Sequence, residues 1–201
     1  ENVGMLFTAK SPTTGWRFNT LLATTHIALC EVHKKLNTEL IHTKLDLFKD
    51  FCTTYIAQPT LKVAGLNPHA GEEGILGNEE QDWLNEALIT WNKKNRDIKL
   101  LGPLSPDSCW NSSAKAWRKK DAEKHDGILA MYHDQGLIPM KVIALNYSVN
   151  TTIGLPFIRT SPDHGTGFDI AGKGIAQCQS MIEAIKAAIE ITKNSRLLNT
   201  H

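Results

Sequence analysis

Few of the features that mark a special class of protein occur in this sequence. Its four cysteines lie far apart and form no CxxC pair, which excludes a zinc ribbon and a thioredoxin-like redox motif. The sequence contains no run of about 18 apolar residues, which is the length needed to cross a membrane. The formal net charge is +1, and the charges are interspersed rather than gathered in a basic stripe of the kind that binds nucleic acid. We therefore expect neither a membrane nor a nucleic-acid partner.

The composition is that of an ordinary globular protein. Hydrophobic residues make up 41% and charged residues 21% of the 201 residues, so a core can form without disulfide staples. We expect the cysteines to be reduced thiols in a cytoplasmic protein. The chain starts at Glu1, without an initiator methionine, and continues directly into an apolar segment, so we expect it to be part of a longer protein.

Apolar strand-like runs alternate with segments of helical periodicity along the whole chain, without any internal repeat. This alternation predicts an α/β fold with a mostly parallel sheet flanked by helices. The expected strands are Val3–Thr8, Leu61–Leu66, Ile98–Leu101, Ile128–Tyr132 and Val149–Leu155, with a further apolar run over Phe18–Thr25. The expected helices are Thr38–Ile56 with Thr38 as N-cap, a segment around Trp83–Trp91, a short helix from Pro139 in its first turn to Leu145, and Ile175–Leu198. Between Leu104 and Asp126 we expect a loop and a short helix.

Three of the eight histidines share one setting, because His26, His69 and His133 each come shortly after a strand-like run. The carboxyl ends of parallel strands meet at one edge of a sheet, and ligand sites form there. Three imidazoles at one edge suit a divalent ion such as zinc or cobalt and, less well, magnesium. A single histidine after a strand is more often a hydrogen-bonded loop residue, so the repeated placement carries this prediction.

A glycine-rich segment, TSPDHGTGFDIAGKG, covers residues 160–174. Its four glycines would let backbone N–H groups approach a phosphate-bearing ligand, although such a composition also fits a plain surface loop. It matches neither a GxGxxG turn nor a P-loop. Arg159, just before it, offers a planar fork for a carboxylate or phosphate, and Lys141 and Asn150 precede it in the chain.

Four motifs together resemble the 4-hydroxythreonine-4-phosphate dehydrogenases of pyridoxal phosphate biosynthesis. They are LATTH (22–26), GLNPHAGEEGILGNEE (65–80), MYHDQGLIPMK (131–141) and GLPFIRTSPDHGTGFDIAGKG (154–174), in the order of that family. The last also resembles the nucleotide loop of isopropylmalate and isocitrate dehydrogenases, which implies their fold. The resemblance further implies that this chain is the C-terminal two-thirds of a two-domain dehydrogenase, with the N-terminal portion absent.

The resemblance also implies roles for particular residues. A divalent metal, zinc, cobalt or magnesium, would be held by His26, His69 and His133, at a site shared across a homodimer interface. The phosphorylated hydroxy acid would contact Lys141, Asn150 and Arg159. NAD or NADP would be bound through His164, Gly165, Thr166 and Asp169.

The implied reaction is metal-dependent oxidation and decarboxylation of 4-phosphohydroxy-L-threonine to 3-amino-2-oxopropyl phosphate. Two alternatives stay open at this point. The same motifs occur in dehydrogenases of D-threonate or D-erythronate 4-phosphate. The chain could also be a non-catalytic metal-binding or dimerisation module.

Overall fold

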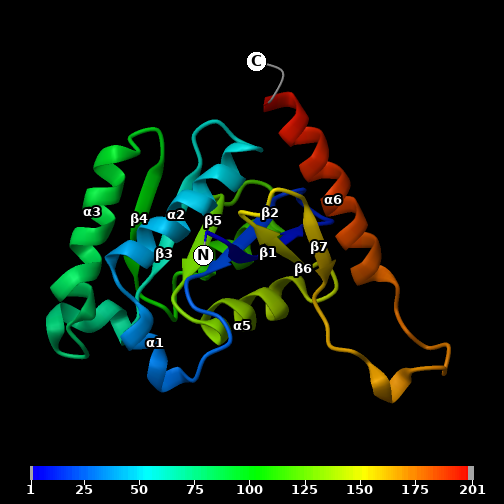
Figure 1. Cartoon of the computed structure of the whole chain (residues 1–201), viewed down its shortest axis with the longest axis horizontal. Coiled ribbons are helices and arrows are strands. Elements are labelled where there is room, and N and C mark those ends of the chain that lie inside the picture. Colours follow the sequence, from blue (N-terminus) through cyan, green and yellow to red (C-terminus); the bar gives the residue numbers. More distant parts are fainter. Residues whose placement is uncertain (1, 199–201) are drawn as a thin grey trace.

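The computed structural model describes the backbone of residues 2–198 and the side chains of residues 2–194. Within these residues, strands and helices alternate around one sheet, which confirms the predicted α/β class (Figure 1). The strands are β1 (Gly4–Lys10), β2 (Arg17–Leu22), β3 (Thr60–Ala64), β4 (Lys99–Leu104), β5 (Gly127–Ala130), β6 (Val149–Ile153) and β7 (Arg159–Pro162). The helices are α1 (Leu29–Lys35), α2 (Thr38–Thr53), α3 (Asn85–Lys94), α4 (Asn111–Arg118), α5 (His133–Ala144) and α6 (Gln179–Leu198). Short helical turns cover Pro68–Gly74, Glu80–Leu84 and Phe168–Ile170.

The strands are ordered β4-β3-β5-β2-β1-β6-β7 in the sheet. Neighbours from β4 to β2 are parallel, whereas β1 is antiparallel to both β2 and β6, and β7 is antiparallel to β6. Five of the seven strands therefore run in one direction, with β1 and β7 opposed. The short connection between β1 and β2 explains the first reversal, because only antiparallel strands can be joined by a tight turn.

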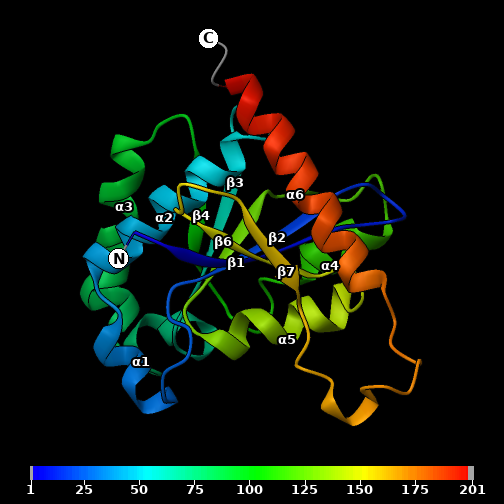
Figure 2. The same ribbon diagram turned by 45° about the vertical axis from the view of Figure 1, so that its right-hand side comes forward.

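Helices cover both faces of the sheet (Figure 2). On one face, α2, α3 and α6 pack against a core that includes Phe48, Trp91 and Ile191. On the opposite face, α4 and α5 contribute Ala116, Leu137 and Met140 to a second cluster of buried residues. We found no helix in residues 2–198 that has both the length and the apolar character needed to cross a bilayer.

Three predicted helix starts were wrong, one of them that of the last helix, α6, which begins at Gln179 and not at Ile175. The side chain of Asn37, not Thr38, caps α2, because its Oδ1 accepts a hydrogen bond from the Leu40 N–H at 2.9 Å. The helix predicted to begin with Pro139 in its first turn is α5, which already begins at His133, so Pro139 lies inside it. A proline inside a helix removes one backbone donor and its ring crowds the carbonyl one turn earlier, a cost that the buried face of α5 offsets.

The buried imidazole of His125, which contacts α4, is expected to make the stability of the fold depend on pH. His125 is 1% exposed, and its Nε2 lies 2.9 Å from Ser113 Oγ. Burial, and then the charge of Lys62, lower the pKa of His125 to about 3, so it is neutral in the folded protein. In the unfolded chain a histidine titrates near its ordinary pKa of about 6.5. The stability that the neutral ring contributes is thus complete above about pH 6.5 and is lost as the pH falls towards the folded pKa.

We expect the free energy of unfolding to fall by about 2 kcal/mol from pH 7 to pH 5 through His125 alone. Urea titrations of the unaltered chain and of a His125→Gln variant at both pH values measure this contribution. The variant is expected to lose less stability on acidification. An equal loss in both proteins would show that His125 is not responsible.

Candidate functional site at the carboxyl edge of the parallel strands

The parallel strands β3, β5 and β2 are neighbours, so their carboxyl ends lie at the same edge of the sheet. Each is followed by one of the three predicted histidines. His26 follows β2, His69 follows β3, and His133 is the first residue of α5, directly after β5. The topology therefore places all three backbone positions at the edge where parallel α/β sheets bind ligands.

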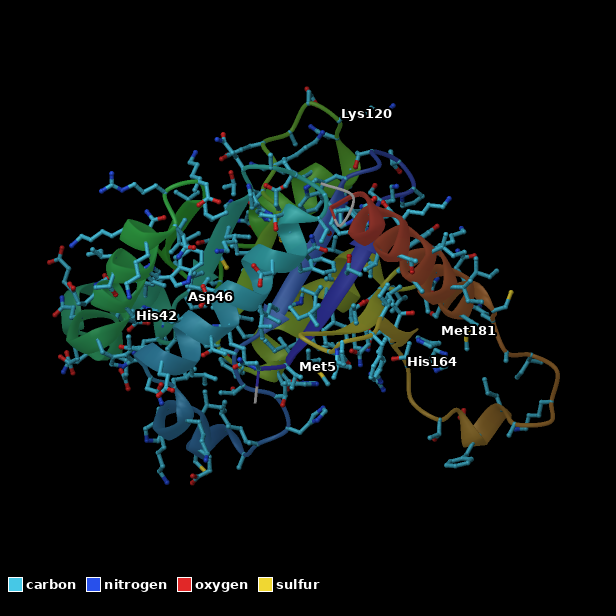
Figure 3. All side chains as sticks on the ribbon, turned by 45° about the horizontal axis from the view of Figure 1, so that its top comes forward. Met5, His42, Asp46, Lys120, His164 and Met181 are labelled. Carbon is cyan, nitrogen blue, oxygen red and sulfur yellow. The ribbon has the colours of Figure 1, made fainter. Side chains whose placement is uncertain are left out.

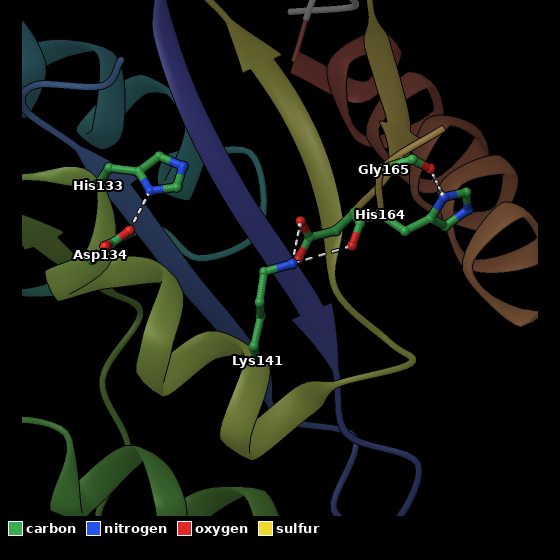
Figure 4. A network of polar contacts seen from close by, with 6 residues as sticks. His133, Asp134, Lys141, His164 and Gly165 are labelled. Atoms are coloured by element: carbon green, nitrogen blue, oxygen red, sulfur yellow. Dashed lines mark hydrogen bonds and ion pairs between the residues drawn. The ribbon is translucent and has the colours of Figure 1, made fainter. Parts of the chain in front are cut away.

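Two of the three imidazoles come together. The ring centroids of His26 and His133 are 5.4 Å apart, and both residues line a cavity of about 300 Å³ with Tyr132 and Asp134. The Nδ1 of His133 lies 2.7 Å from the Asp134 carboxylate (Figure 4). A carboxylate on Nδ1 fixes the ring and leaves Nε2 as the free ligand atom. Imidazole and carboxylate donors are a fitting set for a divalent metal of the zinc and cobalt class.

The third histidine does not join them. Among the described residues, no three His, Cys, Asp or Glu side chains are grouped closely enough to hold a metal ion. His69 lies instead near Asp107. The pKa of the Asp107 carboxyl is below its ordinary value, first because the Ser105 hydroxyl donates a hydrogen bond to it at 2.6 Å, and also through the charge of His69. The sequence reading had not singled out Asp107.

His69 begins an unusual backbone segment. Residues His69 to Glu73 all have positive φ, and four of these five are not glycine. Left-handed backbone is unfavourable for L-residues by roughly 1–2 kcal/mol each, so such a run persists only where the surroundings hold it. We call residues 69–73 the left-handed turn.

Two buried polar side chains hold the ends of β3 and β5. Glu80 is 2% exposed, and its carboxylate accepts hydrogen bonds from the backbone N–H groups of Leu66 and Asn67 at 2.7 and 2.9 Å. Gln135 donates from Nε2 to the Gly65 carbonyl at 2.8 Å, and its Oε1 accepts from the Met131 N–H at 2.6 Å. Both residues lie within motifs quoted above, but nothing in a sequence distinguishes a buried carboxylate from a solvated one.

The three predicted substrate residues lie around one face of the sheet. Asn150 and Thr152 alternate with the buried Val149 and Thr151 on β6, so they point towards the α5 side. Arg159 pairs with Thr152 across the ladder, and its Nη1 donates to Thr152 Oγ1 at 2.9 Å. Lys141 extends from α5.

Lys141 already has an anionic partner. Its ammonium lies 3.2 Å from the carboxylate of Asp163, whose side chain is only 10% exposed (Figure 4). The sequence reading had not identified Asp163, which lies just before the predicted nucleotide loop. An ammonium paired with a carboxylate can exchange that partner for a phosphate or carboxylate of a ligand.

The glycine-rich loop extends away from the body of the molecule between β7 and α6 (Figure 3). It curves around a cavity of about 860 Å³ that all four predicted cofactor residues line, namely His164, Gly165, Thr166 and Asp169. His164 Nδ1 lies 2.7 Å from the carbonyl of its neighbour Gly165. The loop is therefore open enough to admit a large ligand.

Comparison with known proteins agrees with these motifs. The sequence profile of the family described as "Pyridoxal phosphate biosynthetic protein PdxA" matches residues 1–188. Among curated proteins, the 4-hydroxythreonine-4-phosphate dehydrogenase of Synechococcus sp. (strain RCC307) is 53% identical over 193 residues, which are 95% of this chain and 59% of that protein. The enzyme of the same name from Synechocystis sp. (strain ATCC 27184 / PCC 6803 / Kazusa) is 51% identical over 199 residues, covering 96% and 56%.

A solved structure shows the same fold. The crystal structure of 4-hydroxythreonine-4-phosphate dehydrogenase from Klebsiella pneumoniae matches with a TM-score of 0.75 and 34% identity over 95% of this chain and 54% of that one. This match confirms the expected isocitrate dehydrogenase-like fold. The chain thus spans little more than half the length of the relatives it matches.

Proposed function

Because this chain belongs to the PdxA family of pyridoxal phosphate biosynthetic proteins, we propose that it takes part in oxidising and decarboxylating 4-phosphohydroxy-L-threonine to 3-amino-2-oxopropyl phosphate. The reaction would depend on a divalent metal and on NAD or NADP, in the cytoplasm. The observation that carries this proposal is the pair His26 and His133, which share a cavity at the carboxyl edge of the parallel strands. Lys141 projects from the same helix that begins with His133 (Figure 4).

The chain's own residues would bind and orient the reactants. Lys141 and Arg159 supply two positive charges for the phosphate and the carboxylate of the substrate, and Asn150 adds an amide beside them. Asp134 would keep Nε2 of His133 available as a ligand atom. A zinc, cobalt or magnesium ion at His26 and His133, with His69, would lower the pKa of the substrate hydroxyl and stabilise negative charge on oxygen.

The nicotinamide cofactor would be held by the glycine-rich loop. His164, Gly165, Thr166 and Asp169 line one cavity, and the glycines permit close backbone contact with the nucleotide. In this arrangement the substrate would lie between the histidine pair and the loop. The nicotinamide, held by this loop, would supply the hydride acceptor for oxidation of the substrate hydroxyl, and the β-keto acid so formed would lose its carboxylate as carbon dioxide.

We also propose a homodimer in which the metal site is shared. His69 does not reach the other two histidines within the described residues of one chain, so a second copy would complete the ligand set. An exposed apolar stripe along α5 and its C-cap residue supports such an interface, since Ile138, Val142 and the C-cap Leu145 are 61%, 77% and 66% exposed. These residues recur at a spacing that places them on one side of the helix.

The test is formation of NADH from 4-phosphohydroxy-L-threonine by the complete gene product that contains these residues. We expect turnover that EDTA abolishes and added Zn²⁺ or Co²⁺ restores. D-threonate and D-erythronate 4-phosphates serve as matched substrates under the same conditions. Higher kcat/KM on either of them would replace the proposed substrate, and no turnover of any of the three by a folded, metal-loaded dimer would contradict the dehydrogenase proposal.

A further inference from the structure

The backbone that carries His69 is in an unfavourable conformation without an obvious cause in its own sequence. Four non-glycine residues of the left-handed turn, His69, Ala70, Glu72 and Glu73, have φ between 42° and 56°. Alanine and glutamate rarely adopt left-handed backbone, and histidine, although it does so more often, is still strained there. Backbone hydrogen bonds from the Ala70 and Leu76 N–H groups to the Asn67 and Gly71 carbonyls close the turn. Glu80 is the buried side chain in position to hold it from outside.

Glu80 binds the residues just before the left-handed turn and lies close to the middle of the turn. Besides the two backbone N–H groups of Leu66 and Asn67, its carboxylate accepts from Asn67 Nδ2 at 2.8 Å. The other Asn67 hydrogen bond, at 2.7 Å, goes to Glu79. At Gly71 the chain passes so close that an added Cβ would lie 3.0 Å from Glu80 Oε2. A buried carboxylate with three donors is a strong and directional anchor.

Gln135 connects this anchored segment to the strand that precedes His133. It joins the Gly65 carbonyl, at the end of β3, to the Met131 N–H, at the end of β5. Gln135 is 8% exposed and lies two residues after His133 in the first turn of α5. One pair of hydrogen bonds thus links the end of β5 to Gly65 through Gln135. A second pair links the next two residues, Leu66 and Asn67, to Glu80.

We propose that Glu80 and Gln135 form a brace, a pair of positioning residues that fixes where His69 and His133 are presented to a metal ion. The proposal rests on the proposed function for the identity of the ligand. The brace itself rests on the hydrogen bonds at the carboxyl ends of β3 and β5. Its physical role is to keep an unfavourable backbone conformation from relaxing, so that the imidazole of His69 does not have to be ordered when the metal binds.

Glu80→Ala removes all three acceptor contacts and is the main test. Glu80→Gln keeps one acceptor oxygen but turns an NH₂ towards donors, so its effect is expected to be intermediate. Gln135→Leu removes both contacts of the other half of the brace. Asn95→Ala is the matched control, because Asn95 is a buried polar residue that bonds Trp91 and Lys49 at the opposite end of the sheet.

Two readouts separate positioning from general stability. Hydrogen–deuterium exchange of residues 65–77 reports whether the left-handed turn is held, with no metal present. Titration with Co²⁺ alone, followed by calorimetry and by the visible absorption of the bound ion, reports the ligand geometry. We expect at least tenfold faster exchange in Glu80→Ala and a Co²⁺ affinity about 10–100-fold weaker. Asn95→Ala is expected to change neither.

Unchanged exchange in Glu80→Ala, or an equal change in Asn95→Ala, would overturn the brace. So would a loosened turn that leaves the Co²⁺ affinity and spectrum of a binding-competent chain unaltered. Absence of Co²⁺ binding by the unaltered chain would instead contradict the metal site of the proposed function. In that case the exchange comparison still decides whether Glu80 and Gln135 hold the turn.

Discussion

Replacing His133 by alanine is expected to lower kcat/KM of the complete gene product at least about a thousandfold while the fold is retained. The ring of His133 lies beside that of His26 in the cavity at the carboxyl edge of the parallel strands, which we call the edge cavity. Asp134 contacts Nδ1 of His133, so Nε2 of that ring is available to a ligand. A bound metal contributes several kcal/mol to stabilising a transition state, and each 1.4 kcal/mol is a factor of ten in rate. In the proposed metal site, loss of the His133 ligand atom would remove most of that contribution.

The measurement is NADH formation together with Co²⁺ titration and circular dichroism. His33→Ala is the matched control, since His33 is an exposed histidine on α1 outside the edge cavity. We expect the control to keep both turnover and metal affinity. Wild-type turnover in a metal-loaded His133→Ala protein would remove His133 from the site.

Replacing Phe48 by alanine is expected to reduce the free energy of unfolding by about 3–5 kcal/mol. Phe48 is fully buried, and it packs so tightly over Gly127 of β5 that a Cβ there would come within 2.1 Å of the ring. Removing the ring leaves a cavity between α2 and the centre of the sheet. For a chain of this size the loss corresponds to a fall in Tm of roughly 6–20 °C.

Thermal unfolding followed by circular dichroism measures this effect. Phe157→Ala is the control, because Phe157 is 63% exposed and its truncation is expected to change stability by less than about 0.5 kcal/mol. Similar losses in the two variants would mean that α2 is not anchored through Phe48.

Much of the fold could be predicted because periodicity reports burial. Of the apolar positions that recur at helical spacing over residues 38–56, Ile41, Leu45, Phe48 and Cys52 are buried in α2, whereas Ile56 lies beyond the helix end and is 43% exposed. The strand-like runs around Leu61 and Ile128 are central strands. Helix ends were less predictable, since Asn37 and Thr38 are adjacent residues that can both cap a helix. The start of α5 was missed because Pro139 suggested a first turn, whereas packing against β2 and β5 supports the helix from His133 onward.

The candidate site could be predicted only in part. That strands place His26, His69 and His133 at one edge follows from parallel topology, and the structure agrees. That His26 and His133 approach while His69 lies apart depends on the left-handed turn, for which the sequence PHAGEEG offers no ordinary signal. Glu80, Gln135 and Asp163 were missed because their roles depend on tertiary hydrogen bonds and ion pairs rather than on a pattern along the chain.

The pairing of β6 with β7 has a consequence for how related sequences can vary. Arg159 faces the same side as Asn150 only because Thr152 pairs with Arg159 and Asn150 with Ser161. Side chains alternate along a strand, so a slip of one residue would turn the guanidinium to the opposite face, where Val149 packs under α6. The connection at residues 154–158 can therefore change in length among related sequences only if Arg159 stays on the same face of the sheet as Asn150. Homologues are expected to absorb insertions as a bulging loop, with the ladder itself unchanged.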